Sequence, residues 1–167
     1  MQDDYLAPIR VHGLVVPHLL LVVLREGKWN HPGEPAIARV MPWFRDPLDF
    51  LGSTLQMERE SRSLDRLIED DEMAALFRFV RESAATGPVE LPWLDVDRAF
   101  FIAMAQHAGD DTAVALDYRT SSSDPRVVAS DVWTSSAPYA WRPVAQTFSE
   151  FVAELRPGGP DAEPAAT

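Results

Sequence analysis

Hydrophobic residues follow two different periods along this chain, and the change falls close to residue 90. Before it, apolar residues recur with helical spacing in residues 17–24 and 64–80. After it, residues 99–105 form a short continuous apolar run, and residues 112–118 alternate between apolar and polar side chains, as a half-buried strand does. The pattern therefore predicts helices in the first part of the chain and strands in the second.

Two helical regions are predicted before residue 90. Pro17 suits the first turn of a helix whose apolar face continues to Leu24, and Gly27 suits the position just after its end. Residues 63–83 carry two apolar stripes separated by the acids Glu69, Asp70, Asp71 and Glu72. These acids fit the first turn of a further helix, because the helix dipole favours negative charge there.

The segment between these two helical regions has a weaker pattern. Residues 29–35 have the composition of a turn, and residues 37–43 fit a short helix and a short strand equally well. Residues 46–62 open with one apolar segment, 47–51, and continue with polar residues. No element is assigned to this last stretch.

The strands of the second part are joined by short connections. They are predicted at residues 99–105, 112–118, 126–132 and near 139–144. The connections 106–111 and 119–125 are rich in Gly, Asp, Ser and Pro, and they are too short to hold a crossover helix. We therefore expect antiparallel pairing of consecutive strands, that is, a β-meander.

A capped helix is predicted directly after the last strand. Thr147 and Glu150 form a capping box, in which the hydroxyl accepts from the amide of residue 150 and the carboxylate accepts from the amide of residue 147. The apolar stripe of this helix has offsets 0, 3, 4 and 7 and consists of Phe148, Phe151, Val152 and Leu155. The predicted class is α+β, with N-terminal helices, an antiparallel β-meander sheet and a C-terminal helix packed on the sheet.

We expect a single domain with loose ends. Residues 1–11 form a flexible N-terminal lead-in, and residues 157–167 form a disordered tail with no apolar residue larger than Ala. Residues 12–156 contain no linker long enough to divide them, so one α+β domain is predicted there.

Charge and cysteine content limit the classes of partner. The formal net charge is −11, from 26 acidic and 15 basic residues, which disfavours nucleic acid and anionic membranes and favours basic proteins. The longest apolar stretch, residues 14–24, is well short of the roughly 20 residues that span a bilayer, and it lacks the features of a secretion signal. With no cysteine at all, the sequence fits the cytoplasm, which is the expected location.

Candidate reactive groups form only weak constellations. Asp95 and Asp97 resemble a metal-binding carboxylate pair, and His107, Asp110 and Asp111 share one hairpin. The polar face of a strand or loop explains the first group, and a turn between two strands explains the second. There is no nucleophile elbow or phosphate-binding glycine loop. No metal, no cofactor and no enzymatic activity are predicted.

Tryptophan offers a different kind of site. The chain holds five of them, and Trp133 and Tyr139 flank a short polar segment, 134–138. Large aromatic side chains are frequent anchors of protein interfaces. Ordinary core packing accounts for most of these residues, and either Trp133 or Tyr139 is expected at a binding surface.

The C-terminal half resembles the SUKH superfamily. The similarity is carried by Ala115-Leu116-Asp117-Tyr118, by Pro125-Arg126-Val127-Val128 with Asp131, by Trp141, Val144 and Ala145, and by the helix from Thr147 to Leu155. It covers residues 90–156, with 17–29 matching the family's N-terminal helix. The resemblance implies an α+β domain without enzymatic activity that binds proteins, many bacterial members being immunity proteins that neutralise a toxin.

The expected function is therefore a non-enzymatic protein-binding domain, and specifically an immunity protein whose partner is a basic toxin domain such as a nuclease. The residues expected to contact that partner are Glu69, Asp70, Asp71, Glu72, Asp110, Asp111, Trp133 and Tyr139. Two alternatives stay open: a housekeeping scaffold or regulator of SUKH type, and a metal-dependent hydrolase built on Asp95, Asp97, His107, Asp110 and Asp111. The sequence does not specify an oligomeric state.

Overall fold

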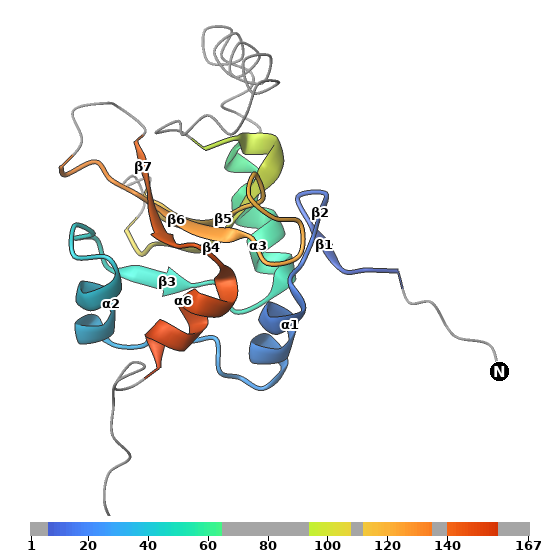
Figure 1. Ribbon diagram of the computed structural model, residues 1–167, viewed down its shortest axis with the longest axis horizontal. Coiled ribbons are helices and arrows are strands. Elements are labelled where there is room, and N and C mark those ends of the chain that lie inside the picture. The colour runs from blue at the N-terminus through green and yellow to red at the C-terminus, as the bar shows by residue number, and fades with distance from the viewer. Residues whose placement is uncertain (1–6, 65–93, 108–111, 135–139, 157–167) are drawn as a thin grey trace, which may run out of the picture.

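The structure is a computed structural model, which describes residues 7–64, 94–107, 112–134 and 140–156. Within these ranges the fold is α+β, with a five-stranded antiparallel sheet, a two-stranded ribbon and a C-terminal helix packed on the larger sheet (Figure 1). The predicted fold class is confirmed. Nearly all of the helical region predicted at residues 63–83 lies outside the described residues.

The large sheet pairs its strands in sequence order. It consists of β3 (Leu48–Phe50), β4 (Ala99–Ala105), β5 (Ala113–Asp117), β6 (Arg126–Ser130) and β7 (Trp141–Ala145). Every neighbouring pair is antiparallel, which confirms the meander predicted for the last four strands. The first strand was not predicted: β3 adds to the sheet beside β4, with Leu48 opposite Ala105 and Phe50 opposite Ala103.

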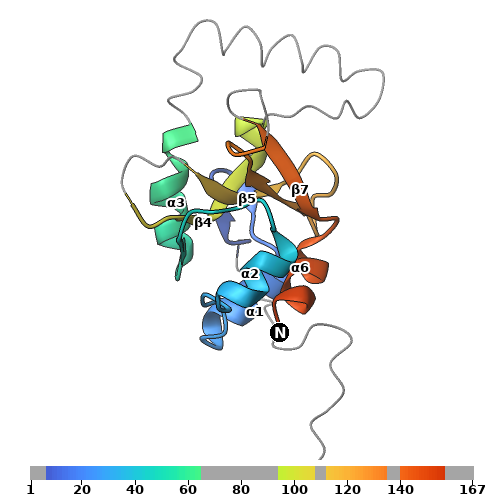
Figure 2. The ribbon, with the colours of Figure 1, turned by 90° about the vertical axis from the view of Figure 1, so that its left-hand side faces the viewer.

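Helices and the small ribbon surround this sheet. The described elements are β1 (Arg10–Val11), β2 (Leu14–Val15), α1 (His18–Arg25), α2 (Glu34–Val40), α3 (Thr54–Ser61) and α6 (Phe148–Leu155). Figure 2 shows α1, α2 and α6 grouped on one side of the sheet, whereas α3 lies beside β4. Because the central strands are covered in this way, every residue of β5 and β6 is buried. None of the helices in the described ranges combines the length and the apolar character that a membrane crossing requires.

The first two helices begin and end where the local chemistry directs them. Pro17 stands immediately before α1, and Gly27 follows its end with a φ of +66°, a left-handed conformation that glycine adopts without a steric penalty. Both predicted boundaries are confirmed. The segment 37–43, which fitted two structures equally, is mainly helical: α2 begins after Gly33 and carries Pro35 in its first turn.

Helix α3 was not predicted, although its start carries a capping signal. The Oγ of Ser53 accepts a hydrogen bond from the amide of Gln56 at 3.1 Å, and the Gln56 side chain accepts one from the amide of Gly52 at 3.0 Å. At the other end, Ser61 is fully buried and its Oγ accepts the Phe101 N–H at 3.0 Å. The register of β4 shifts between Phe101 and Ala103, so Ser61 satisfies a donor at a β-bulge.

The C-terminal helix α6 is capped as predicted on one side only. The Oγ1 of Thr147 accepts from the amide of Glu150 at 3.1 Å, but the Glu150 carboxylate accepts from the amide of Gln146 at 3.0 Å instead of that of Thr147. Phe148 and Phe151 are fully buried. The predicted apolar face therefore packs into the core.

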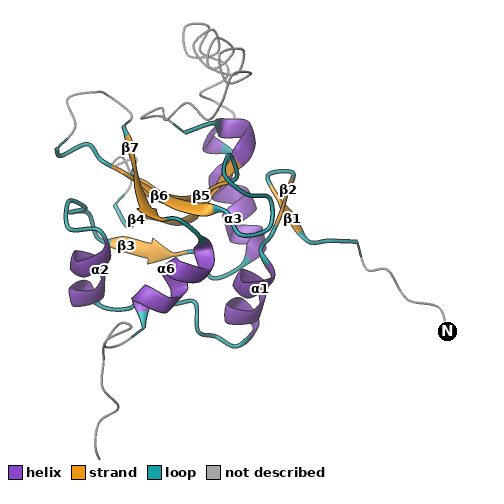
Figure 3. Ribbon diagram, in the orientation of Figure 1, coloured by secondary structure: helices purple, strands orange, loops and turns teal. Residues whose placement is uncertain are grey.

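Trp29 joins α6 to the rest of the core. Its ring centroid lies 5.6 Å from that of Phe148, 6.3 Å from that of Phe151 and 4.8 Å from that of Phe50 on β3. These separations are typical of favourable aromatic pairs. The loop after α1, the edge strand β3 and the C-terminal helix thus meet around one indole. Figure 3 shows α1 and α6 below β3 in the view.

Strand β7 is an edge strand of the sheet as described, and it contains Pro143. The Asp131 amide donates to the Ala140 carbonyl at 2.9 Å, and alternation of bonded pairs along an antiparallel ladder then turns the Pro143 nitrogen away from β6. Proline lacks an N–H. The outer margin of β7 therefore has no amide donor at its centre.

Candidate functional site

Most residues expected to bind a partner lie outside the described residues. This applies to Glu69, Asp70, Asp71, Glu72, Asp110, Asp111 and Tyr139. The structure therefore tests neither their exposure nor their proximity to one another. Of the predicted set, it describes Trp133.

Trp133 is half-buried and packs against the protein itself. Its ring meets that of Phe44 edge to face, with centroids 4.9 Å apart, and its amide donates to Oδ1 of Asp131 at 3.3 Å. The neighbouring Val132 is the more exposed of the two. A partner could contact only the part of the Trp133 ring that the core leaves open.

Asp131 organises the backbone around Trp133. Its carboxylate is buried, accepts from the amide of Thr134 at 2.9 Å and from the Thr134 hydroxyl, and lies 3.2 Å from the guanidinium of Arg142. Burial would raise the pKa of Asp131, but the hydrogen bonds from Thr134 and Trp133 and the charge of Arg142 outweigh it and lower that pKa. This carboxylate holds the loop after β6 in place, and its oxygens are already engaged in hydrogen bonds and an ion pair within the protein.

A second buried carboxylate, Asp117, binds two guanidinium groups. Arg126 donates from Nε to Oδ2 at 2.8 Å, and Arg119 donates from Nε and Nη2 to both carboxylate oxygens at 2.8–3.1 Å. Burial alone would raise the pKa of Asp117, but the hydrogen bonds from both arginines and the charge of Arg119 hold it below its ordinary value of 3.8. The cluster fixes the ends of β5 and β6.

The candidate metal ligands are not brought together where the structure describes them. Asp95 is buried and its Oδ1 accepts from the amide of Asp97 at 3.1 Å, so it caps a short 3₁₀ turn at Val96–Arg98. Asp97 and His107 are exposed. Among the residues that the structure describes, no three His, Asp or Glu side chains are arranged to hold a metal ion.

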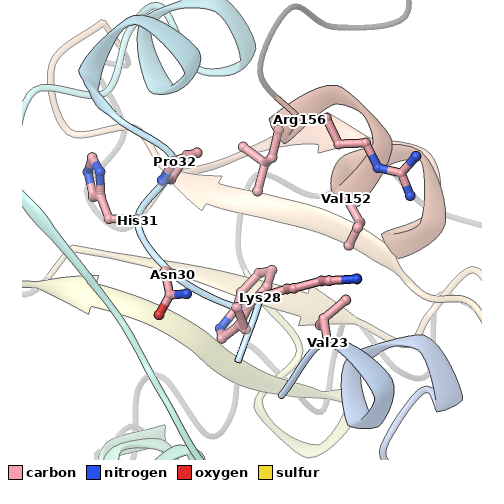
Figure 4. Close-up of a pocket in the computed structure, with 9 residues that line it drawn as sticks. Val23, Lys28, Asn30, His31, Pro32, Val152 and Arg156 are labelled. Carbon is pink, nitrogen blue, oxygen red and sulfur yellow. The ribbon is translucent and has the colours of Figure 1, made fainter. Parts of the chain in front are cut away.

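A cavity of about 440 Å³ opens between the loop after α1 and the end of α6. Its apolar lining comes from Val23, Trp29, Pro32, Val152 and Leu155. Its polar lining comes from Lys28, Asn30, His31 and Arg156. Figure 4 shows that these side chains come from two segments at opposite ends of the sequence, and we call this space the Trp29 cavity.

Trp29 itself carries an unsatisfied polar group. The residue is only 5% exposed, and its indole N–H is the one buried side-chain nitrogen or oxygen in the described part of the chain that has no hydrogen-bond partner. A buried donor in this state costs about 1–3 kcal/mol. Native structures leave few such groups, so each one calls for a physical explanation.

The charged residues that line the Trp29 cavity are basic. Lys28 lies 2.8 Å from Glu26, which is outside the lining, and both side chains are well exposed. The Nδ1 of His31 accepts from the amide of Gly33 at 3.0 Å, which places the proton of a neutral ring on Nε2, 3.5 Å from Glu34. Lys28 and Arg156 thus supply fixed positive charge to the described part of the lining.

Sequence reasoning did not find the Trp29 cavity. The turn predicted at residues 29–35 is confirmed for 29–33, whereas Glu34 and Pro35 already belong to α2, and Val152 and Leu155 lie on the predicted inner face of α6, half-buried and buried respectively. The sequence feature that could have indicated this site is the Trp at the start of the turn at residues 29–35. A large aromatic residue in a turn between two helices needs a packing partner from elsewhere in the chain.

Comparisons with models of protein families, with curated proteins and with solved structures find no match to this chain.

Proposed function

We propose that this chain is a non-enzymatic, protein-binding domain of SUKH type that serves as an immunity protein and neutralises a cognate toxin. The observation that carries the proposal is the order of elements: helices first, then an antiparallel meander, then one capped helix on the sheet. This is the α+β arrangement that the resemblance implies. The proposal also places the protein in the cytoplasm, in keeping with a chain free of cysteine.

The residues behind the resemblance support a shared framework. Asp117 pairs with Arg126 in the core, Asp131 fixes the loop after β6, and Phe148 and Phe151 anchor α6. Each of these contacts determines how the polypeptide folds. A family that shares such positions keeps its scaffold while its surface varies, which suits proteins that must each recognise a different toxin.

The charge of the chain supports a basic partner. A net charge of −11 accelerates association with a cationic surface and disfavours nucleic acid. A nuclease exposes cationic groups that bind phosphate, so an acidic protein can cover them. We assign the contacts to Glu69, Asp70, Asp71, Glu72, Asp110 and Asp111, together with an aromatic anchor at Trp133 or Tyr139.

Co-expression tests the proposal directly. Cells that express a toxin gene adjacent to the gene for this chain should stop growing, and co-expression of the full chain should restore growth. Purified toxin and chain should then co-elute, with an affinity that falls as salt is raised. If no adjacent gene product is toxic, or if the chain restores growth with none of them, the immunity role is wrong.

Charge variants locate the surface. Replacing Glu69, Asp70, Asp71 and Glu72 with Gln or Asn removes four negative charges, and the matched control removes Asp3, Asp4, Asp161 and Glu163 in the same way. The first variant should bind the toxin at least roughly tenfold more weakly than the control, because charge pairs at an interface are coupled locally. Equal loss in the two variants would mean that only overall charge matters.

A housekeeping role makes a different prediction. A scaffold or regulator would co-purify with the same stoichiometric partner from cells that carry no toxin gene. An immunity protein would have no such partner there and would acquire one when the toxin is expressed.

A further inference from the structure

We propose that the Trp29 cavity binds a small amphipathic carboxylate, with an apolar ring or chain against Trp29, Val152 and Leu155 and the anionic group beside Lys28 and Arg156. This inference goes beyond the protein-binding function and does not depend on it. Three properties carry it: the size of the cavity, the charge of its lining and the unsatisfied indole N–H.

The size and lining of the cavity fit a small ligand. A volume of about 440 Å³ is within the range of small-molecule sites, which are mostly apolar and hold a few directing polar groups. Val23, Trp29, Pro32, Val152 and Leu155 supply the apolar surface. They come from α1, the following loop and α6, and Trp29 is fixed by packing against Phe148 and Phe151, so this surface is preformed.

The charge of the lining selects an anion. The chain as a whole carries −11, yet the lining residues that the structure describes include Lys28 and Arg156 and no acid. In Figure 4 the nitrogen-bearing ends of Lys28 and Arg156 extend to the same side of the view. A carboxylate placed between them would find two donors that bind oxygen anions well.

Nearby negative groups oppose this charge but do not cancel it. Glu26 pairs with Lys28, but both side chains are well exposed and solvent weakens such pairs, so a ligand carboxylate can compete for the ammonium group. Glu34 faces His31. The C-terminal end of α6 carries a partial negative charge of about half a unit, whereas Arg156 at that end carries a full positive charge.

The indole N–H favours a ligand that bears oxygen. It has no acceptor among the described residues, although Trp29 lines the cavity and is almost fully buried. A hydrocarbon would leave this donor unsatisfied. The nitrogen itself is buried, so a ligand oxygen reaches it only after a small shift of the neighbouring side chains. That contact would remove the penalty, so acceptor-bearing ligands should bind better than apolar molecules of the same shape.

A titration of the full chain with 3-phenylpropionate tests the proposal. The indole N–H resonance of Trp29 in NMR spectra reports binding, and the Trp29→Phe variant, which lacks that resonance, assigns it. The acid should shift this resonance saturably. The neutral amide of the same molecule should bind at least roughly threefold more weakly, the loss expected for an exposed charge contact, and 3-phenylpropylamine more weakly still. Equal affinity for acid and amide would overturn the assignment of charge.

Variants identify the site. Val152→Trp fills the cavity and should abolish the shift, while its melting temperature shows that the fold persists. Arg156→Gln should weaken binding of the acid roughly threefold and leave the amide unchanged, whereas Arg62→Gln, an exposed arginine of α3's end outside the cavity, should change neither. Binding that survives Val152→Trp in a folded protein, or no saturable shift in the parent chain, would overturn the proposal.

A carboxylate next to an apolar group occurs both in free metabolites and at the C-terminus of a peptide. A peptide that ends in Phe with a free carboxylate, compared with its amidated form, distinguishes the two sources. Tighter binding of the free-acid peptide than of 3-phenylpropionate would assign the site to a polypeptide terminus, and the reverse order would assign it to a small molecule. Because this readout needs no toxin, it can fail while the immunity role stands.

Discussion

Asp117 and Arg126 lie directly opposite each other on β5 and β6, with Nε and Oδ2 2.8 Å apart, and both residues are buried. Arg119 completes the cluster from the turn after β5. An ion pair in such a place gains strong attraction but loses the hydration of its charges, so its loss is felt most when only one partner is removed.

Replacement of Asp117 should therefore destabilise the fold strongly. Asp117→Asn removes the carboxylate charge beside two guanidinium groups, and the free energy of unfolding should fall by about 3 kcal/mol. Urea unfolding measures the change. Asp49→Asn, at an exposed position of β3, is the matched control and should change stability by less than about 0.5 kcal/mol. Similar values for the two variants would contradict the structural role of the cluster.

The same carboxylate should make stability depend on acid. The pKa of Asp117 is lower in the folded state than its ordinary value of 3.8, so the folded state binds this proton less readily than the unfolded state. Its contribution is fully present above pH 3.8 and is lost as the pH falls through the folded pKa. Urea midpoints measured from neutral pH down to about pH 2.5 should show a smaller acid-induced loss for Asp117→Asn than for Asp49→Asn.

Ser61 should matter more than its small size suggests. Its buried hydroxyl is the acceptor for the Phe101 N–H at the bulge of β4, and Ser61→Ala would leave that amide unsatisfied. The expected loss is about 2 kcal/mol, measured by chemical unfolding. Ser63→Ala removes an exposed hydroxyl that donates to the Glu60 carbonyl, and it should cost less than about 0.5 kcal/mol. An equal loss of stability in the two variants would contradict the role of Ser61 at the bulge.

The cap of α6 gives a prediction of moderate size. Thr147→Ala removes the acceptor for the Glu150 amide and should cost about 1 kcal/mol, whereas Thr147→Asp, which keeps an acceptor, should retain most of the stability. Thr120→Ala, in an exposed turn, serves as the control. Thermal unfolding of the four proteins measures the order. A cap that contributes nothing would place Thr147→Ala level with the control.

Local sequence patterns predicted the elements that have a regular or continuous run of apolar residues. Strand β4 was predicted with its observed bounds because residues 99–105 are continuously apolar, and α6 because a cap precedes a regular apolar stripe. Strand β3 was missed since it has three residues and pairs Leu48 with Ala105, far along the chain. Helix α3 was missed because few of its residues are apolar, and its exposed Leu55 and buried Ser61 run against the usual pattern.

The Trp29 cavity could not be predicted from local patterns because, like the pairing of β3, it depends on contacts between residues far apart in the sequence. Lys28 and Arg156 are separated by most of the chain, and only the packing of Trp29 on Phe148 and Phe151 brings their segments together. Local patterns in the sequence assign Trp29 to a turn and Phe151 to a buried helix face. They do not predict that Trp29 and Phe151 are in contact, because local periodicity carries no information about which distant segments pack together.

Pro143 has a consequence for how copies of this protein behave toward one another. Open strand margins invite further strands, and growth of that kind leads to fibrils when a chain accumulates to high concentration. With no amide donor at the middle of β7's outer side, an incoming strand would lose a central rung of its ladder. This margin of the sheet is thereby guarded against self-templated aggregation by a single imino acid.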